Sequence, residues 1–141
     1  MTAKERSREI VEMLSYIDDK DERLQFVIDK GKNVPELEDQ FKTEEFRIEG
    51  CQSNLWLVPE FKGELILFRI DADAVITKGI AALLVEVYSD STADEIMELD
   101  ADFLSEAGIT QHLTPNRRNG LANISQKIQD YASAHKTGNS A

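Results

Sequence analysis

A chain of 141 residues, 41% of them hydrophobic, is long enough to bury a core as a single domain without disulfides or structural metals. Its 16 basic and 27 acidic residues give a net charge of −11, which argues against binding to nucleic acid or to anionic membranes. A single cysteine, no signal-peptide-like N-terminus and no apolar run long enough to span a bilayer together predict a cytoplasmic protein.

Two short helices are predicted at the N-terminal end, paired as an antiparallel hairpin. A Thr-x-x-Glu capping box at residues 2–5 opens the first, and apolar residues recur at helical spacing to about residue 17. The second is expected to begin at a cap within Asp18–Asp21 and to stop at Gly31, because glycine commonly ends a helix after a basic last turn. Pro35 then breaks the helical pattern.

Three β-strands are expected next, over 45–49, 54–59 and 64–70, where polar and apolar residues alternate or bulky apolar residues gather. Gly63 marks a short hairpin turn between the second and the third strand. Pro59 is expected to close the second strand, because proline has no N–H to donate to a ladder. The three strands predict an antiparallel meander.

Helices follow the strands. Asp71 or Asp73 is predicted to cap the most apolar helix of the chain, which should pack across the sheet. Gly79 lies within this helix, where it is tolerated if another backbone approaches closely. A second capping box at 92–95 opens a short helix, and residues 100–107 form another that ends at a glycine.

The last helix is expected to begin at Thr114 and Pro115, which provide a capping hydroxyl and an N1 proline. Residues 137–141 are small and polar, so we expect them to fray. The order of elements is two helices, three strands and then several helices. It predicts one α+β domain over 1–141, in which helices pack against a three-stranded antiparallel sheet.

The only cysteine, Cys51, lies between the first two predicted strands. A turn there would place it at a hairpin tip, where Gly50 reaches positive φ easily and the amides that follow are free to face the sulfur. Cysteine is a nucleophile only as the thiolate, so a chemical role needs a nearby cation, an N–H cradle or a partner that supplies the electrophile. A buried structural cysteine is the alternative.

Four side chains could assist a thiolate: His112, Arg117, Arg118 and Lys78. His112 could act as a base or simply bond to backbone near a loop. Arg117 and Arg118 fall in the first turn of the last helix, where a cation opposes the helix dipole. One of them could therefore meet an anion, although a salt bridge explains it equally well. One cysteine with His112 and His135 makes no familiar zinc spacing, so no metal site is expected.

Three motifs, in order around the single cysteine, resemble the SufE/CsdE family of sulfur-acceptor proteins, and the similarity covers nearly the whole chain. They are Gly50-Cys51-Gln52-Ser53 before an apolar strand with Trp56, Asp71-Ala72-Asp73-Ala74 before Lys78-Gly79, and Thr110-Gln111-His112-Leu113-Thr114-Pro115-Asn116-Arg117.

The resemblance implies a fold similar to the IscU-type cluster scaffold. It also implies a function: the chain takes persulfide sulfur from a pyridoxal-phosphate cysteine desulfurase of the SufS or CsdA type, stimulates that enzyme, and passes the sulfur to an iron–sulfur scaffold. The chain would be a carrier rather than an enzyme, with no bound cofactor because pyridoxal phosphate belongs to the partner. Association as a homodimer is left open. The implied site is Cys51 as acceptor on a loop that swings out, with Gly50, Gln52, Asp73, His112 and Arg117 in support.

Two other classes of function remain open. A stand-alone thiol enzyme or redox sensor would need a base or an oxyanion site beside Cys51, and it would turn over without a protein partner. A non-catalytic interaction module would use the acidic faces, and it would tolerate the change Cys51→Ser.

Overall fold

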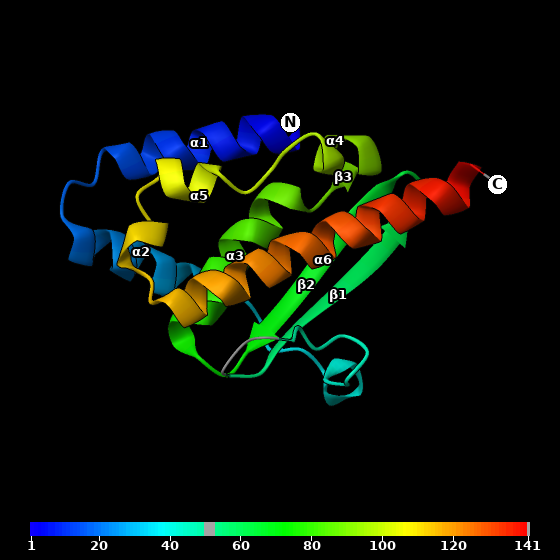
Figure 1. Cartoon of the computed structure of the whole chain (residues 1–141), viewed down its shortest axis with the longest axis horizontal. Coiled ribbons are helices and arrows are strands. Elements are labelled where there is room, and N and C mark those ends of the chain that lie inside the picture. The colour runs from blue at the N-terminus through cyan, green and yellow to red at the C-terminus, as the bar shows by residue number, and fades with distance from the viewer. Residues whose placement is uncertain (50–52, 141) are drawn as a thin grey trace.

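The structure is a computed structural model that describes residues 1–49 and 53–140, without the side chains of His112 and of 137–140. Helices pack against a three-stranded antiparallel sheet of order β1-β2-β3, and the long C-terminal helix runs beside the strands (Figure 1). The elements are α1 (Ala3–Ser15), α2 (Lys20–Lys32), η1 (Asp39–Phe41), β1 (Leu55–Lys62), β2 (Leu65–Ala72), α3 (Val75–Tyr88), β3 (Ser91–Thr92), α4 (Ala93–Met97), α5 (Phe103–Glu106), η2 (Thr110–His112) and α6 (Pro115–Ser140).

The N-terminal helix hairpin is confirmed, but its second helix ends differently from the prediction. Thr2 and Glu5 form the predicted capping box, and Asp19 caps α2 by accepting hydrogen bonds from the backbone of its first turn. Gly31 does not stop α2, which continues to Lys32. A Cβ at Gly31 would lie 2.7 Å from the backbone nitrogen of Gly79 in α3. This glycine therefore permits close helix packing rather than a left-handed turn.

The central helix of the fold is α3, as predicted. Residues on almost every side of it are buried, because β2, α1, α2 and α6 all pack on it. Gly79 was predicted to be tolerated inside this helix if another backbone approaches closely, and this prediction is confirmed. Gly79 lies where the backbones of α2 and α3 cross, so that a Cβ there would overlap Val27.

The hairpin of β1 and β2 turns at Gly63, which has φ of 60° as the predicted turn requires. Pro59 does not close the strand, since β1 continues past it and pairs Pro59 with Phe68. The reason is that β1 is an edge strand. Leu57 donates its N–H outward to Phe46, and two residues later Pro59 faces the same open edge, where a missing N–H costs no ladder bond.

The third strand is not the predicted segment 45–49. That segment contributes only an isolated antiparallel bridge, between Arg47 and Trp56. The third strand is β3, which pairs with the beginning of β2. With two residues β3 shows no periodicity in the sequence, and it forms because the chain returns past β2 after α3. The predicted α+β class with a three-stranded antiparallel sheet is nevertheless confirmed.

Neither Asp71 nor Asp73 caps α3, contrary to the prediction. The N-cap residue is Ala74, which offers no side-chain hydrogen bond. Asp71 is buried instead, where it accepts hydrogen bonds from the backbone of Leu37 at 3.0 Å and of Ala72 at 2.8 Å. Its carboxylate thus joins an upstream loop to β2.

The later helices follow the sequence more closely. The capping box at Thr92 opens α4, and Gly108, with φ of 78°, follows α5. The helix predicted over 100–107 is shortened to the four residues of α5. Thr114 caps α6 as predicted, because its hydroxyl accepts the N–H of Arg117 at 3.3 Å. The backbone of α6 is helical to Ser140, and the fraying of 137–141 stays a prediction.

Candidate functional site

Three of the predicted site residues, Gly50, Cys51 and Gln52, lie outside the described residues. The structure does describe the chain on both sides of them. Ile48 donates its N–H to the carbonyl of Leu55 at 2.8 Å, beside the isolated bridge to β1. The base of the predicted hairpin therefore forms. Residues 50–52, which we call the cysteine segment, connect its two arms in the sequence.

Both arms are fastened to the body of the fold. On the first, the carbonyl of Glu49 accepts a hydrogen bond from the side-chain amide of Asn123 in α6 at 2.8 Å. On the second, Asn54 donates to Asp73 at 2.9 Å and accepts from the guanidinium of Arg47 at 3.2 Å. Asp73, a predicted supporting residue, thus holds the end of the cysteine segment rather than a helix terminus.

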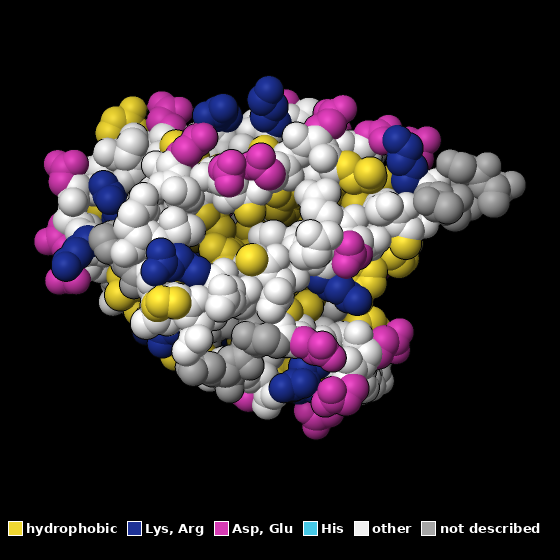
Figure 2. All heavy atoms as spheres, viewed as in Figure 1, with side chains coloured by type: hydrophobic (Ala, Val, Ile, Leu, Met, Phe, Trp, Pro, Cys, Tyr) yellow, Lys and Arg dark blue, Asp and Glu magenta, His cyan; other side chains and the backbone are white. Residues whose placement is uncertain are grey.

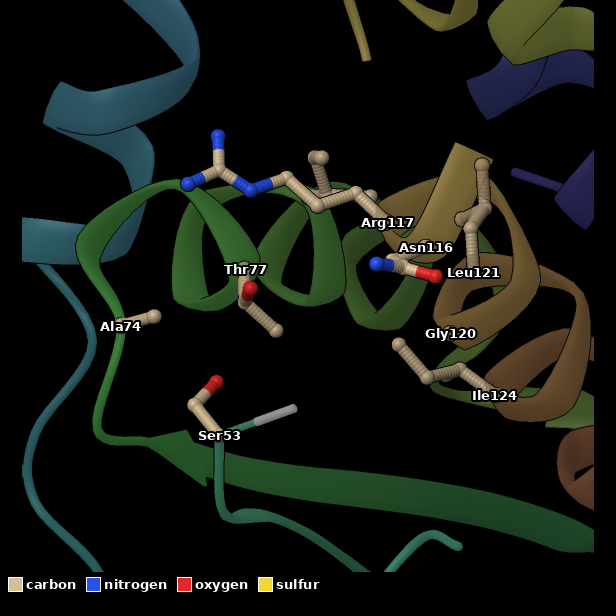
Figure 3. A pocket seen from close by; sticks show the side chains of 9 residues that line it. Ser53, Ala74, Thr77, Asn116, Arg117, Gly120, Leu121 and Ile124 are labelled. Atoms are coloured by element: carbon tan, nitrogen blue, oxygen red, sulfur yellow. The ribbon is translucent and has the colours of Figure 1, made fainter. Parts of the chain in front are cut away.

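A cavity of about 180 Å³ opens beside Ser53, the first described residue after Cys51 and Gln52. Figure 3 shows it between Ser53, the first turns of α3 and the first turns of α6. Its lining is apolar toward the protein core and carries hydroxyl, amide and guanidinium groups elsewhere. The lining residues are Ser53, Ala74, Thr77, Ile80, Asn116, Arg117, Gly120, Leu121 and Ile124.

The N-terminal ends of α3 and α6 both lie at the cavity, and the N-terminal end of a helix favours an anion. The N-cap residue of α3 is Ala74, whose side chain cannot accept a hydrogen bond. The N–H groups of the first turn of α3 are therefore not capped by the N-cap side chain. Arg117 reaches from α6 toward the first turns of α3 (Figure 3), and within residues 1–49 and 53–140 its guanidinium forms no ion pair. The predicted role of Arg117 in meeting an anion is therefore compatible with its position.

The other candidates are placed differently. The ammonium of Lys78 is paired with the carboxylate of Asp71 at 3.2 Å, and its role beside a thiolate stays a prediction. Arg118 lines a separate groove. His135 lies near the far end of α6, where its ring stacks on Phe61. His112 is in η2 with its side chain outside the description, so its role stays a prediction. In the described part of the chain, no cluster of three or more potential metal ligands occurs.

Sequence reasoning missed the polar side chains that fasten the two arms: Arg47, Asn54 and Asn123. Asn54 and Asn123 are exposed and Arg47 is half-buried, and the contacts of Asn123 and Asp73 span 74 and 19 residues of chain. No spacing within the sequence could reveal such pairs. The one available signal was the position of Asn54 at the junction between a turn and a strand, where asparagine commonly bonds to neighbouring groups.

A family model described as SufE, Fe-S metabolism associated domain, matches residues 8–132. The chain belongs to the SufE family. An uncharacterized SufE-like protein of Rhizobium meliloti is 33% identical over 129 residues, covering 88% of this chain and 92% of that protein. Another from Rhizobium etli is 34% identical over 129 residues, covering 88% and 87%.

A plant SufE relative is longer. SufE-like protein 1, chloroplastic/mitochondrial, of Arabidopsis thaliana is 36% identical over 126 residues, which cover 89% of this chain but 34% of the plant protein. A solution structure of a hypothetical protein from Thermus thermophilus has the same fold, with a TM-score of 0.79, 20% identity, and coverage of 94% of this chain and 96% of that one. Within the described residues, no helix is long and apolar enough to cross a membrane.

Proposed function

We propose that Cys51 accepts persulfide sulfur from a pyridoxal-phosphate cysteine desulfurase, stimulates that enzyme, and passes the sulfur on for iron–sulfur cluster assembly. Membership of the SufE family supports a role as a sulfur acceptor in Fe–S metabolism. The observation that carries the proposal is the cavity beside Ser53, which lies where two helices begin and next to the segment that holds the only cysteine.

The transfer is a thiol–disulfide type of exchange. The thiolate of Cys51 attacks the outer sulfur of the desulfurase persulfide. A sulfur–sulfur bond forms to Cys51 while the bond between the two donor sulfurs breaks, and the donor cysteine leaves as a thiolate. The proton on the outer sulfur stays with it, and no external oxidant or reductant is consumed. The carrier therefore needs an accessible thiolate and a protected place for its product, but no general acid of its own.

The cavity offers such protection. Two peptide units separate Cys51 from Ser53, so their Cα atoms are within about 7 Å of each other. At about 180 Å³ the cavity is several times larger than the roughly 30 Å³ that a water molecule occupies, so a sulfur fits. Its apolar wall of Ile80, Leu121 and Ile124 would exclude competing thiols, while Arg117 and the helix N-termini would stabilise an anionic sulfur.

The direct test is the intact mass of the protein after incubation with the native desulfurase and free cysteine. We expect a gain of about 32 Da that reductant removes, because one sulfur atom is added as a reversible cysteine cap. The Cys51→Ser variant is the matched control and should gain nothing. Alanine release by the desulfurase should rise with wild-type chain and not with the variant.

Failure of the wild type to gain mass, while the native desulfurase is active, would overturn the proposal. Turnover of a substrate by Cys51 without a protein partner would favour the stand-alone thiol enzyme. Desulfurase binding and stimulation that persist in Cys51→Ser would favour an interaction module.

The Asp73→Ala variant should make Cys51 more reactive. It removes the carboxylate that holds Asn54, so the arm after the cysteine segment loses one exposed hydrogen bond and Cys51 spends more time away from the cavity. We expect iodoacetamide to alkylate Cys51 about threefold faster in this variant. This factor corresponds to the low end of the free energy that one hydrogen bond contributes to stability. Asp18→Ala, at an exposed position, is the control. An unchanged rate in Asp73→Ala would show that this contact does not restrain the segment.

A further inference from the structure

A second hollow, which we call the α6 groove, has a volume of about 460 Å³. It lies between α6 and the chain that connects α4 to α5, and Figure 2 shows an apolar floor at the centre of this face with acidic side chains along its edge. Tyr88 and Leu121 lie at its floor. Its walls include Asp100 and Asp102 on one side, and Arg118 and Ala122 on the α6 side.

The groove is formed in the free chain. Its lining on α6 extends from Arg118 to Gln129, a helix length of about 16 Å. The opposite wall is held in place because the side-chain amide of Gln129 donates to the carbonyls of Ile96 at 2.8 Å and of Leu99 at 3.1 Å. The hydroxyl of Tyr88 donates to the same Leu99 carbonyl at 2.7 Å. A partner would therefore find this shape preorganised, which lowers the entropic cost of binding.

The charges of the groove lack partners within the described part of the chain. Neither Asp100 nor Asp102 forms an ion pair there, although the carboxylate of Asp100 accepts the N–H of Asp102 at 3.0 Å. Two carboxylates beside an apolar floor complement a segment that combines apolar side chains with a lysine or an arginine. The net charge of −11 would further steer a basic surface toward the chain.

The groove adjoins the cavity beside Ser53. Leu121 lines both hollows, and the consecutive residues Arg117 and Arg118 line one each. A stable protein interface buries about 800 Å² on each partner, a patch of roughly 16 Å radius. A desulfurase that delivers sulfur to Cys51 must reach the mouth of the cavity, and an interface of this size that extends along α6 includes the groove.

We propose that the α6 groove receives a segment of the cysteine desulfurase that places apolar side chains on the groove floor and a lysine or arginine beside Asp100 and Asp102. This inference rests on the proposed function. The groove would contribute affinity and orientation, whereas Cys51 would contribute the chemistry.

The test measures the affinity of the native desulfurase for chains that all carry Cys51→Ser, so that no sulfur transfer interferes. Asp102→Lys reverses one charge of the groove, and Ala122→Trp fills it without changing charge; both residues are exposed. Each should weaken binding about tenfold. Glu64→Lys at the hairpin turn and Ala134→Trp farther along α6 are the matched controls and should stay within about twofold of the parent. Asp102→Lys should also flatten the salt dependence of the affinity.

The outcomes separate the two proposals. If the parent binds and both groove variants bind as tightly as their controls, the groove proposal is overturned and the proposed function is untouched. If the parent does not bind the native desulfurase and wild-type chain gains no sulfur from it, both proposals fail. Every variant must unfold at the same temperature as its parent. A loss of affinity then reports on the groove and not on a loss of the fold.

Discussion

Replacing Gly79 with alanine should lower the free energy of unfolding by about 3 kcal/mol, although alanine favours an isolated helix by about 1 kcal/mol over glycine. The added Cβ would lie 2.8 Å from both the carbonyl carbon and a side-chain methyl of Val27 in α2. The carbonyl carbon belongs to a helix backbone, so relief requires α2 and α3 to separate. Urea denaturation, with the slope unchanged, measures the loss.

Gly31→Ala should behave in the same way, because its Cβ would meet the backbone of Gly79 from the other side. The two losses should not add in the double variant, since separation of the helices relieves both overlaps. Glu9→Ala, at an exposed position of α1, is a suitable control and should change stability by no more than about 0.5 kcal/mol. Wild-type stability in Gly79→Ala would contradict the close approach of the two backbones.

The elements that could be predicted from the sequence are those whose causes lie within a few residues. The capping boxes at Thr2 and Thr92 and the turn at Gly63 are of this kind, and all three form. The strand predicted over 45–49 has the right alternation but finds only one bridge, because a strand needs a partner as well as a pattern. The short strand β3 has a partner and no pattern.

The candidate site shows the same division between features with a local cause and features that depend on distant parts of the chain. Arg117 could be identified because a cation in the first turn of a helix is locally unfavourable, and the structure places it at the cavity. The local pattern predicted that Asp73 could cap α3, which is wrong because it holds Asn54, whereas its place among the site residues was implied by the family resemblance and not by the local pattern. The hydrogen bond from Asn123 to Glu49 joins residues 74 positions apart, and only the tertiary fold brings them together.

The Asp71→Asn variant should lose about 3 kcal/mol of stability at neutral pH, because removal of one partner leaves a largely buried charge uncompensated. The Asp71 carboxylate lies 3.2 Å from the ammonium of Lys78 in α3 and 3.5 Å from that of Lys42, which also lies over the ring of Trp56. An amide keeps the shape and some hydrogen bonds but none of the charge. Because Lys78 belongs to the first turns of α3, the loss should also loosen the wall of the cavity.

The pH dependence of this contribution follows from the pKa of Asp71. Burial alone would raise this pKa, but the N–H groups of Leu37 and Ala72 and the charge of Lys78 outweigh it and lower the pKa below the ordinary value of 3.8. A lowered folded-state pKa stabilises the protein above the unfolded-state value, and this stabilisation disappears as the pH falls through the folded-state value. The stability difference between wild type and Asp71→Asn should therefore be constant from about pH 7 to 5 and shrink toward pH 3. A difference that stays constant down to pH 3 would show that the Asp71 carboxylate does not titrate as these contacts require.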